Sequence, residues 1–359
     1  MNDNNYVIIM AGGIGSRFWP FSRSHYPKQF QDILGTGKTL IQQTAARFQD
    51  ICPPENIYVV TNKDYKSLVK EQLPFLGDEQ LLLEPAMRNT APCIAYATYK
   101  IHSQNPNAVL TIAPSDHIIL REQDFERVAL SALEVATKED ILVTLGITPT
   151  RPDTGYGYIQ YLGEQRLKGL LKVKTFTEKP NLELAESFIE SGDFVWNSGI
   201  FISNAESMIR QYQELLPDIA ELFEEISAVY YTEKEPERVK EVYYQCSNIS
   251  IDYGIMEYAP NVYVIPCEFG WSDLGTWKSL FELSEKDGDN NVLQGNITTY
   301  HAKDCIVKTP EERLVVIEGL EGYIVAEKDN VLLICPKDQE QRIKQYLNDV
   351  KIKKGSEFS

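Results

Sequence analysis

The sequence predicts an α/β fold, in which a mostly parallel sheet with helices on both faces is followed by a small all-β domain. Two observations lead to this prediction. Short apolar runs without alternation, typical of fully buried strands, alternate with amphipathic helical stretches up to about residue 150. Beyond residue 291, short strands and turns follow one another at a spacing of roughly nine residues.

The first part of the chain supplies the elements of the sheet. Its strands are expected at residues 6–10, 57–61, 81–83, 108–113 and 141–146, and its helices at residues 39–48, 64–73, 92–102 and 122–137. Residues 150–203 are rich in Gly and Tyr and predict mixed strands and loops. After them we expect helices at residues 205–228 and 235–245, a buried strand at 262–266 and a helix at 274–283.

A linker separates this part from the second domain. Residues 286–291 read KDGDNN, which is typical of a connecting segment. Short strands are then expected at residues 297–300, 305–308, 314–317, 323–326 and 331–335, with a helix at 338–347. The sequence therefore predicts two domains, residues 1–285 and 292–359.

The amino-acid composition and net charge of the chain limit the kinds of molecule that it can bind. With 43% hydrophobic and 24% charged residues among 359, the chain has the composition of a folded protein. A formal charge of −17 argues against nucleic acid or an anionic membrane as partner, so an anionic ligand requires a local basic site. The six cysteines, at positions 52, 93, 246, 267, 305 and 335, show no C-x-x-C or metal-ligand spacing, which indicates buried free thiols in a reducing compartment. Without a signal peptide or an apolar run of about 18 residues, a cytoplasmic location is expected.

A glycine-rich stretch follows the first strand. Residues 11–15 read AGGIG, where bare backbone amides can approach a ligand closely, and three cations follow at Arg17, Arg23 and Lys28. This order suits a polyphosphate. The alternative is an ordinary tight turn beside solvated arginines, and the glycines alone do not decide between them.

Two familiar phosphate-binding motifs are excluded. Phe18 stands where the third glycine of a dinucleotide fingerprint belongs, which makes a dinucleotide oxidoreductase a poor interpretation. Around Gly37-Lys38-Thr39, Asp32 stands where a P-loop needs its first glycine. What remains is G-x-G-x-R-x-x-P followed by S-R and P-K.

Carboxylates and amides follow three further strands. Residues 84–92 read EPAMRNTAP, in which Asn89 and the main chain near Thr90 could pair with a base edge; the alternative is a loop with Thr90 as helix cap. Asp116, in the run APSDH, could hold Mg²⁺, which prefers one or two carboxylates with phosphates and waters, or could instead form a turn or cap a helix. Asp273, in GWSDLGTW, is a second candidate ligand or the cap of a helix that starts at Leu274. We interpret His117 as a packing residue.

Two more segments point toward a sugar site, and a third has a structural interpretation. Glu178 and Lys179 are adjacent, and because strand neighbours point to opposite faces we expect no salt bridge between them. Asn197 lies beside Trp196, an aromatic wall suited to a sugar ring, although an edge strand with a buried Trp would give the same pattern. Asp252, in IDYGIME, is expected only to cap a helix.

Residues 11–30, AGGIGSRFWPFSRSHYPKQF, resemble the signature of the sugar-nucleotide pyrophosphorylases. The WPFSR insert and the PKQF ending are similar to its mannose-1-phosphate guanylyltransferase (GDP-mannose pyrophosphorylase) branch. The runs EPAMRNTAP, APSDH, TGYGYI, FTEKP, WNSGIF, IDYGIME and GWSDLGTW resemble further family segments in family order, so the resemblance covers residues 6 to about 280.

The resemblance implies a reaction and a fold. Guanylyl would be transferred from GTP to α-D-mannose 1-phosphate by Mg²⁺-assisted in-line attack on the α-phosphate, giving GDP-mannose and pyrophosphate. The sheet would be Rossmann-like, of the nucleotidyltransferase (GT-A-like) kind, and the C-terminal domain a left-handed β-helix used for packing or for a homodimer. The chain would be a short form without the isomerase activity of the long family members.

The residues and the resemblance together give three sets of site residues. The catalytic set is Arg17, Lys28, Asp116 and Asp273, of which Asp116 and Asp273 are the metal ligands. The nucleotide-binding set is Ala11, Gly12, Gly13, Gly15, Ser16, Arg17, Arg23, Lys28, Glu84, Asn89, Thr90 and Ser115. The sugar-phosphate set is Gly157, Glu178, Lys179 and Asn197. The resemblance implies that the backbone amide of Gly157 approaches the sugar hydroxyls, that Glu178 accepts hydrogen bonds from them, and that Lys179 contacts the phosphate.

Two rival functions stay open at this point. One is the same fold acting on another pair of substrates, such as glucose 1-phosphate with UTP or dTTP. The other is a non-catalytic sugar-nucleotide sensor, which would be expected to lose Lys28 or the metal carboxylates, and the sequence retains all of them.

Overall fold

The structure, a computed structural model, describes residues 2–359 and divides into two compact units. The first unit contains residues 2–12, 44–115 and 119–271; the second contains residues 13–43, 116–118 and 272–359. Helix α1 (Leu40–Arg47) and the short strands β5 (Ile118–Ile119) and β11 (Trp271–Ser272) each contain residues of both units.

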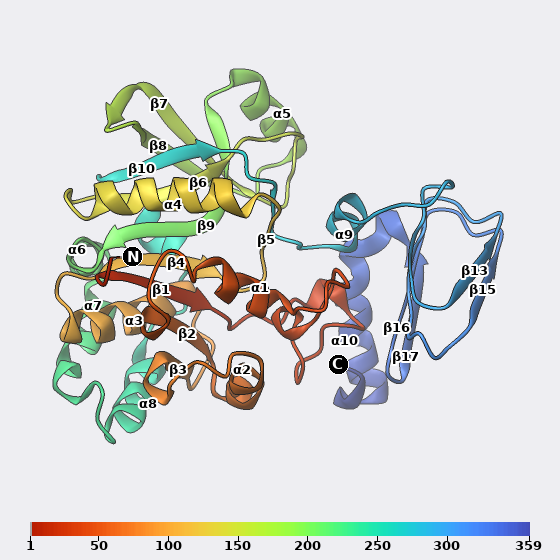
Figure 1. Cartoon of the computed structure of the whole chain (residues 1–359), viewed down its shortest axis with the longest axis horizontal. Coiled ribbons are helices and arrows are strands. Elements are labelled where there is room, and N and C mark those ends of the chain that lie inside the picture. Colours follow the sequence, from red (N-terminus) through yellow and green to blue (C-terminus); the bar gives the residue numbers. More distant parts are fainter. Residues whose placement is uncertain (1) are drawn as a thin grey trace. The chain divides into compact units, whose positions relative to one another are not determined.

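A nine-stranded mixed sheet forms the first unit, in the order β3-β2-β1-β4-β9-β6-β10-β8-β7 (Figure 1). The strands are β1 (Asn5–Met10), β2 (Ile57–Asn62), β3 (Leu81–Glu84), β4 (Val109–Pro114), β6 (Leu142–Ile147), β7 (Gly157–Leu167), β8 (Leu170–Glu178), β9 (Phe194–Asn204) and β10 (Val262–Cys267). The α/β class is confirmed. The pairs within β3-β2-β1-β4 and the pair β6–β10 are parallel, and β9 and the β7–β8 hairpin add antiparallel pairs.

The register of the parallel strands aligns their carboxyl ends. Met10 is opposite Val60 on one side and Pro114 on the other, and Asn62 is opposite Glu84. Ligands of α/β sheets bind beyond such ends. The segments that continue from β1, β3 and β4 carry the residues predicted to bind nucleotide.

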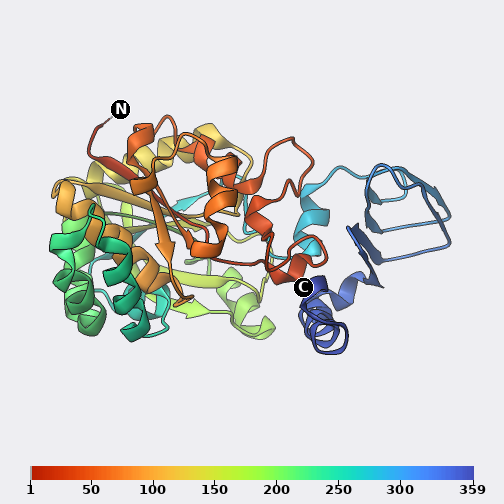
Figure 2. The ribbon, with the colours of Figure 1, turned by 90° about the horizontal axis from the view of Figure 1, so that it is seen from below.

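Helices cover both faces of this sheet. They are α2 (Lys66–Gln72), α3 (Thr90–Gln104), α4 (Glu122–Ala136), α5 (Leu182–Ser191), α6 (Ala205–Leu215), α7 (Pro217–Glu225) and α8 (Glu235–Gln245). Helix α4 packs on β4, β6, β9 and β10, and α6 and α7 lie over the opposite face (Figure 2). The expected helix over residues 205–228 is two helices, because Pro217 disfavours helical backbone at Leu216, whose φ is −133°.

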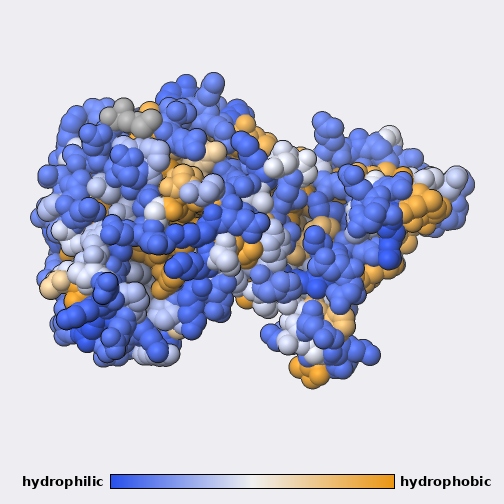
Figure 3. All heavy atoms as spheres, turned by 60° about the horizontal axis from the view of Figure 1, so that its bottom comes forward, coloured by the Kyte–Doolittle hydropathy of each residue, from blue (hydrophilic) through white to orange (hydrophobic). Residues whose placement is uncertain are grey.

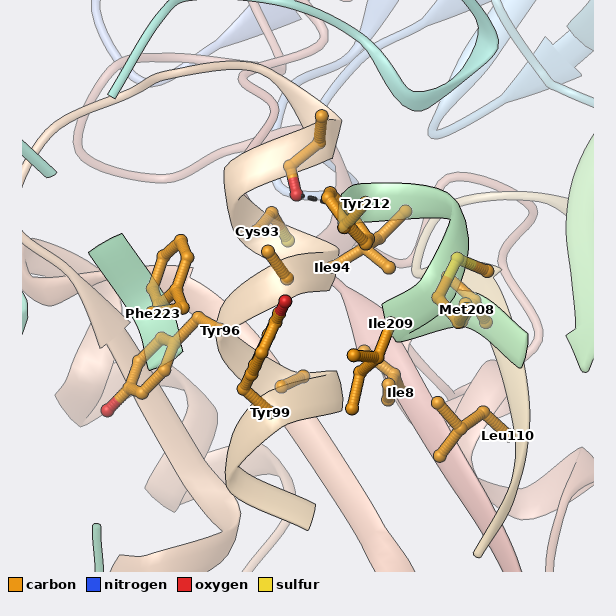
Figure 4. Close-up of a cluster of buried hydrophobic side chains, with 14 of the residues drawn as sticks. Ile8, Cys93, Ile94, Tyr96, Tyr99, Leu110, Met208, Ile209, Tyr212 and Phe223 are labelled. Carbon is orange, nitrogen blue, oxygen red and sulfur yellow. Dashed lines mark hydrogen bonds between the residues drawn. The ribbon is translucent and has the colours of Figure 1, made fainter. Parts of the chain in front are cut away.

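Successive side chains of a strand point to opposite faces of the sheet, so every second residue of the central strands enters one hydrophobic core. Ile8 of β1 and Leu110 of β4 pack with Tyr99 of α3 and Ile209 of α6, all buried (Figure 4). The Tyr212 hydroxyl donates to the carbonyl oxygen of Ala91 at 2.7 Å, which ties α6 to the first turn of α3 (Figure 4). This core fixes the helix that begins next to the EPAMRNT segment.

Parallel strands in a β-helix-like coil form much of the second unit. They are β12 (Val292–Gln294), β13 (Ile297–Tyr300), β14 (Ile306–Lys308), β15 (Val315–Glu318), β16 (Tyr323–Lys328) and β17 (Val331–Pro336), followed by α10 (Ile343–Lys354). Ile297 pairs with Val315 and Ile306 pairs with Ile324, each 18 residues apart, so every second strand of the nine-residue pattern stacks in parallel. β17 closes the sheet as an antiparallel edge.

The glycine-rich loop belongs to the same core as these strands. Phe18 and Ile33 are buried together with Trp277 of α9 (Trp277–Leu283), Ile306 of β14 and Ile343 of α10. The Phe18 and Trp277 rings lie 5.4 Å apart. The loop that carries Arg17, Arg23 and Lys28 is thus built on the C-terminal strands and helices.

The cysteines and the lengths of the helices bear on the chain as a whole. All six cysteines are buried and unpaired, which confirms the prediction of free thiols. Among residues 2–359, every helix is too short or too polar to cross a membrane.

Candidate active site

In the first unit, predicted nucleotide-binding residues gather at the ends of β1, β3 and β4. The amide of Ala11 donates to the carbonyl oxygen of Val60 at 2.8 Å, and the amide of Ser115 donates to that of Met10 at 3.0 Å. A Cβ atom on Gly12 would lie 3.1 Å from Glu84 Oε2, so the glycine leaves room for this carboxylate. Ala11, Gly12, Glu84 and Ser115 are brought together here.

Burial dominates the chemistry of Glu84. Its side chain is only 6% exposed, and its Oε1 accepts a hydrogen bond from the Tyr243 hydroxyl at 3.2 Å. Burial raises the pKa of Glu84 to about 7, against the smaller opposing effect of the Tyr243 hydrogen bond. A carboxyl group with this pKa changes its charge near neutral pH. In its charged form it accepts hydrogen bonds from N–H donors.

The EPAMRNT segment continues from Glu84 into α3. Asn89 caps the helix, because its side chain accepts from the Thr90 amide at 2.9 Å while its own φ is 68°. The alternative in which Thr90 caps the helix is wrong, since the Thr90 hydroxyl instead accepts from the Ile251 amide at 2.9 Å. Arg88 donates to the Tyr243 carbonyl oxygen at 3.0 Å, which holds the segment against α8.

In the second unit, the glycine-rich loop wraps closely around Lys28. Gly15 has a φ of +70°, and a Cβ atom there would lie 2.4 Å from the Cβ of Lys28. The Lys28 amide donates to the Ile14 carbonyl oxygen at 3.1 Å, and Gln29 donates to that of Gly13 at 2.8 Å. Only glycine tolerates both this conformation and this approach.

Oxygen atoms converge on the Lys28 ammonium group. Its Nζ lies 2.8 Å from Asp116 Oδ2 and donates to the carbonyl oxygens of Asp273 at 2.9 Å and Leu274 at 2.8 Å. The Lys28 side chain is 3% exposed, whereas that of Asp116 is 30% exposed. Three of the four predicted catalytic residues are therefore brought together around one buried positive charge.

The surroundings of Asp116 and Asp273 differ from those expected of structural caps. Burial pushes the pKa of Asp116 upward, but the charges of Lys28 and His117 outweigh it and hold that pKa below its ordinary value. The alternative in which Asp273 caps the following helix is wrong. That helix starts at Trp277 with Thr276 as its cap, and Asp273 accepts from the Gly275 amide within a turn where Leu274 has a φ of +43°.

The two arginines of the loop differ. Arg23 is buried, and its guanidinium group donates to the Pro20 and Lys328 carbonyl oxygens at 3.2 and 2.8 Å and to Asn330 Oδ1 at 3.3 Å. Arg17, on the short 3₁₀ helix Ser16–Phe18, is partly exposed and donates to Gln341 Oε1 at 3.2 Å. Arg23 therefore supports the loop from within, while Arg17 keeps part of its surface open.

Gly157 and Glu178 face each other on the β7–β8 hairpin. They are register partners, and a Cβ atom on Gly157 would lie 2.6 Å from Glu178 Oε2. The prediction that Glu178 and Lys179 do not pair is wrong: the ammonium group of Lys179 contacts Glu178 Oε1. β8 ends at Glu178 and Lys179 takes a φ of +48°, so the alternation of a strand no longer applies.

Asn197 lies on β9, which is a central strand rather than an edge strand. Its Nδ2 donates to Asp252 Oδ1 at 2.7 Å, and its Oδ1 accepts from the Gly199 amide at 3.0 Å. Trp196 is only 3% exposed, and its ring packs against Tyr156 at 5.0 Å. The prediction of Trp196 as an aromatic wall is therefore wrong.

Asp252 is the residue whose place the sequence analysis missed. It begins a π-helical turn, Asp252–Met256, that has no side-chain cap, so the prediction of a helix cap is wrong. Its carboxylate instead binds Asn197 and lines a pocket with Gly157 and Glu178. The IDYGIME run was the available signal, but nothing in it indicates a partner 55 residues away.

Residues 6–290 match the nucleotidyl transferase family, and residues 295–349 match the mannose-phosphate isomerase/GMP-like β-helix domain. The chain belongs to the nucleotidyl transferase family. The C-terminal match agrees with the parallel coil, and it confirms the expectation of a β-helix-like domain.

Three relatives of this nucleotidyl transferase extend over nearly its whole length. Mannose-1-phosphate guanylyltransferase of Salmonella montevideo is 36% identical over 358 residues, 98% of this chain and 74% of that protein. The Escherichia coli K12 protein of the same name is 35% identical over 96% of this chain and 73% of that protein. A solved structure from Thermus thermophilus, described as mannose-1-phosphate geranyltransferase, has a TM-score of 0.86 at 31% identity, covering 97% of this chain and 99% of that one.

Members of this family generally use divalent cations, and the donor set at Lys28 suits one. Among residues 2–359 there is no cluster of three or more His, Cys, Asp or Glu side chains arranged to hold a metal ion. One carboxylate and two carbonyl oxygens already converge on a positive charge there. Mg²⁺ prefers this kind of sparse oxygen site, which phosphates and waters complete.

Proposed function

We propose that the nucleotidyl transferase moves guanylyl from GTP to α-D-mannose 1-phosphate, giving GDP-mannose and pyrophosphate. The observation that carries the proposal is the convergence of Lys28, Asp116 and Asp273 at the base of the glycine-rich loop. The choice of substrates is supported by relatives named mannose-1-phosphate guanylyltransferase over 96–98% of this chain.

The nucleotide would be bound through its phosphates and its base. Backbone amides of residues 11–16, with Arg17 and Lys28, would bind the triphosphate, and Arg23 would keep the loop in shape. Ionised Glu84 would accept hydrogen bonds from the N–H groups of guanine, with Asn89, Thr90 and Ser115 beside it. A buried acceptor of this kind discriminates between bases because a base without matching donors leaves it unpaired.

The sugar phosphate would be bound by residues of the β7–β8 hairpin and β9. Glu178, beside Gly157, accepts hydrogen bonds from hydroxyls, and Lys179 takes the phosphate. Asn197 offers a donor and an acceptor in a fixed orientation, because hydrogen bonds to Asp252 and Gly199 hold its amide. In this arrangement Lys179 exchanges its contact with Glu178 for one with the incoming phosphate.

Asp116 and Asp273 would hold Mg²⁺ or another divalent cation. The cation supplies positive charge that polarises the α-phosphate and neutralises the phosphate oxygens. The Lys28 ammonium group, now shared by Asp116 and two carbonyl oxygens, would turn to the departing pyrophosphate. Its charge is then available where negative charge develops.

The reaction itself requires no covalent enzyme intermediate. The phosphate oxygen of the sugar attacks the α-phosphorus in line, a new P–O bond forms, and the bond to pyrophosphate breaks on the opposite side. The nucleophile is already an anion, so no general base is needed. Catalysis then consists of positioning two polyanions and neutralising their charge, which is the part that Arg17, Lys28 and Lys179 play.

Pyrophosphate release from a matrix of substrates tests the proposal. We expect GTP with mannose 1-phosphate to exceed UTP, dTTP or ATP with mannose 1-phosphate, and GTP with glucose 1-phosphate, by at least about tenfold in kcat/KM. Preference for another pair would contradict the proposed choice of substrates but not the proposed nucleotidyl transfer. Tight binding of GDP-mannose with no pyrophosphate release from any pair would instead support a sugar-nucleotide sensor.

We also propose that two copies associate through the C-terminal strands, in the cytoplasm. β17 is the edge of its sheet, and its outward side chains Leu332 and Ile334 are more than half exposed. Figure 3 shows hydrophobic surface on this C-terminal part of the chain. An apolar edge strand is suited to pair with its own copy. Leu332→Lys is expected to convert a dimer to a monomer in light scattering; a wild-type monomer would contradict the proposal.

A further inference from the structure

The first unit contains a small pocket whose lining combines predicted sugar-phosphate residues with residues outside every predicted site. Its lining includes Gly157, Glu178 and Asn197, which were assigned to the sugar phosphate, together with Asp252 and Tyr253. The pocket has a volume of about 30 Å³. This is room for a single hydroxyl group or water and not for a sugar ring.

Asp252 is fixed in this pocket by its surroundings. Its Oδ1 accepts the Asn197 Nδ2 hydrogen bond at 2.7 Å, and the π-helical turn that it begins has a buried far side formed by Gly254, Ile255 and Met256. Burial raises the pKa of Asp252, while the Asn197 hydrogen bond and the charge of Lys179 oppose this. A carboxylate has about four acceptor sites, and the hydrogen bonds from Asn197 and from the backbone amide of Asp252 itself use two of them.

The lining selects the kind of group that can enter. Glu178, Asp252 and Glu257 all line the pocket with carboxylates, which repel a phosphate and require a hydrogen-bond donor. Tyr253 is 52% exposed beside them and offers an aromatic surface of the kind that packs against a sugar ring, a role that buried Trp196 cannot fill. A neutral polyol with one hydroxyl directed into the pocket satisfies these conditions.

We propose that Asp252 is a specificity-determining residue that accepts a hydrogen bond from one hydroxyl of the hexose, beside the amide of Asn197. The inference rests on the proposed function, because the hexose is the sugar of the sugar phosphate. It adds a residue that selects the sugar by the position of one hydroxyl. A role limited to orienting Asn197 would not need the charge, which is costly to bury.

Deoxy analogues test the contact directly. Binding of mannose 1-phosphate and its 2-, 3-, 4- and 6-deoxy analogues is measured by calorimetry for the wild type, Asp252→Asn and Asp218→Asn, whose side chain is exposed on α7. Asp252→Asn keeps the shape and removes the charge. We expect roughly 10- to 100-fold weaker binding of mannose 1-phosphate, as for loss of a hydrogen bond to a charged group, with Asp218→Asn unchanged.

The decisive result is the pattern across the analogues. For one deoxy sugar the penalty of Asp252→Asn should largely disappear, because the contact is already absent, and for the other three it should persist. An equal penalty with all analogues would show that Asp252 acts only through Asn197 and would overturn the proposal, as would no penalty at all. The KM for GTP should change by less than about twofold.

Two further measurements keep the outcome clear. If Asp252→Asn lowers the melting temperature by more than a few degrees, Asp252→Glu replaces it: the charge remains, the longer side chain fills the pocket, and the same single analogue should lose the least affinity. Binding needs no turnover. Sugar-phosphate binding without pyrophosphate release would therefore contradict the proposed reaction alone, whereas no binding by the wild type would overturn the inference.

Discussion

The two units bury charges of opposite sign in their candidate site residues. In the first unit these charges are the carboxylates Glu84 and Asp252, and burial raises the pKa of both. In the second unit they are the cations Arg23 and Lys28, whose N–H groups donate to carbonyl oxygens and, for Lys28, to a carboxylate. The carboxylates of the first unit thus have too few hydrogen-bond donors and positive charges near them to offset their burial. The cations of the second unit have acceptors for their N–H groups.

This difference teaches what each unit contributes to the proposed reaction. A buried carboxylate with few hydrogen-bond donors discriminates between neutral ligands that offer donors, such as the N–H groups of a base or the hydroxyls of a sugar. A ligand without a matching donor leaves the carboxylate unpaired. A buried cation held at a fixed position attracts negative charge that develops nearby, and Lys28 would reach the departing pyrophosphate by exchanging some of its present hydrogen bonds for bonds to phosphate oxygens. Specificity should therefore reside mainly in the first unit and rate mainly in the second.

The largest expected effect comes from Lys28→Ala. Loss of a preorganised charge typically costs about 2.7–4 kcal/mol in the transition state, so turnover should fall roughly 10²–10³-fold. Asp273→Asn should reduce turnover by a factor in the same range. Pyrophosphate release measures this, with Lys38→Ala on the exposed end of the same loop as control and circular dichroism to check folding. Near-wild-type turnover in a folded Lys28→Ala protein would remove Lys28 from the mechanism.

The next effect is the pH dependence of stability that Glu84 introduces. Its pKa in the folded protein, about 7, lies above its ordinary value of 4.5, so the folded state binds the proton more tightly. The stability that protonated Glu84 contributes is therefore complete below pH 4.5 and is lost as the pH rises through 7, by up to about 3 kcal/mol. Glu84→Gln should remove this loss, so the variant gains stability over the wild type between about pH 5 and pH 8.

Urea unfolding at several pH values measures that difference, with exposed Glu79→Gln as control. A constant difference between wild type and Glu84→Gln would contradict the raised pKa. The proposed contact with guanine gives a second readout of opposite sign. Wild-type affinity for GTP should rise as the pH passes through about 7, because the charged carboxylate is the better acceptor, and Glu84→Gln should lose this rise.

Arg23→Met should affect the stability of the loop more than the chemistry. The substitution leaves the carbonyl oxygens of Pro20 and Lys328 without their donor, which should cost roughly 1.5–3 kcal/mol. Faster hydrogen exchange at residues 13–30 and 328–330 would show it, with exposed Arg342→Met as control. A loss of turnover as large as that of Lys28→Ala, without faster exchange, would indicate that Arg23 acts on the substrate.

Much of the second unit's site could be predicted from sequence because its signals are local. Lys28, Asp116 and Asp273 each stand in a short motif, and for Asp116 and Asp273 a strand that ends just before the motif fixes where the side chain emerges. The C-terminal strands were also predictable from their nine-residue spacing. That alternate strands stack at 18 residues was not, because hairpins between neighbours would give the same spacing.

Errors in the first unit have a common physical origin, which is backbone geometry set by tertiary contacts. The pair Glu178–Lys179 forms because Lys179 leaves the strand conformation, with a φ of +48°. Asp252 points to Asn197 because a π-helical turn replaces the α-helix whose cap it was expected to form. Neither conformation is preferred by its residue type, so propensity and periodicity could not indicate it.

The smallest expected effect, that of Gly157→Ala, separates specificity from rate within this comparison. The new methyl group would lie 2.6 Å from Glu178 Oε2, which is the end of a flexible side chain that can move away, so stability should fall by no more than about 1 kcal/mol. Displaced Glu178 would bind sugar hydroxyls less well, and the KM for mannose 1-phosphate should rise several-fold with kcat and the KM for GTP nearly unchanged. Gly15→Ala, in the second unit, should instead reduce kcat, because a Cβ atom 2.4 Å from Lys28 Cβ meets the fixed start of that side chain at a φ of +70°. If both alanine variants altered kcat and KM in the same way, the division of specificity and rate between the two units would fail.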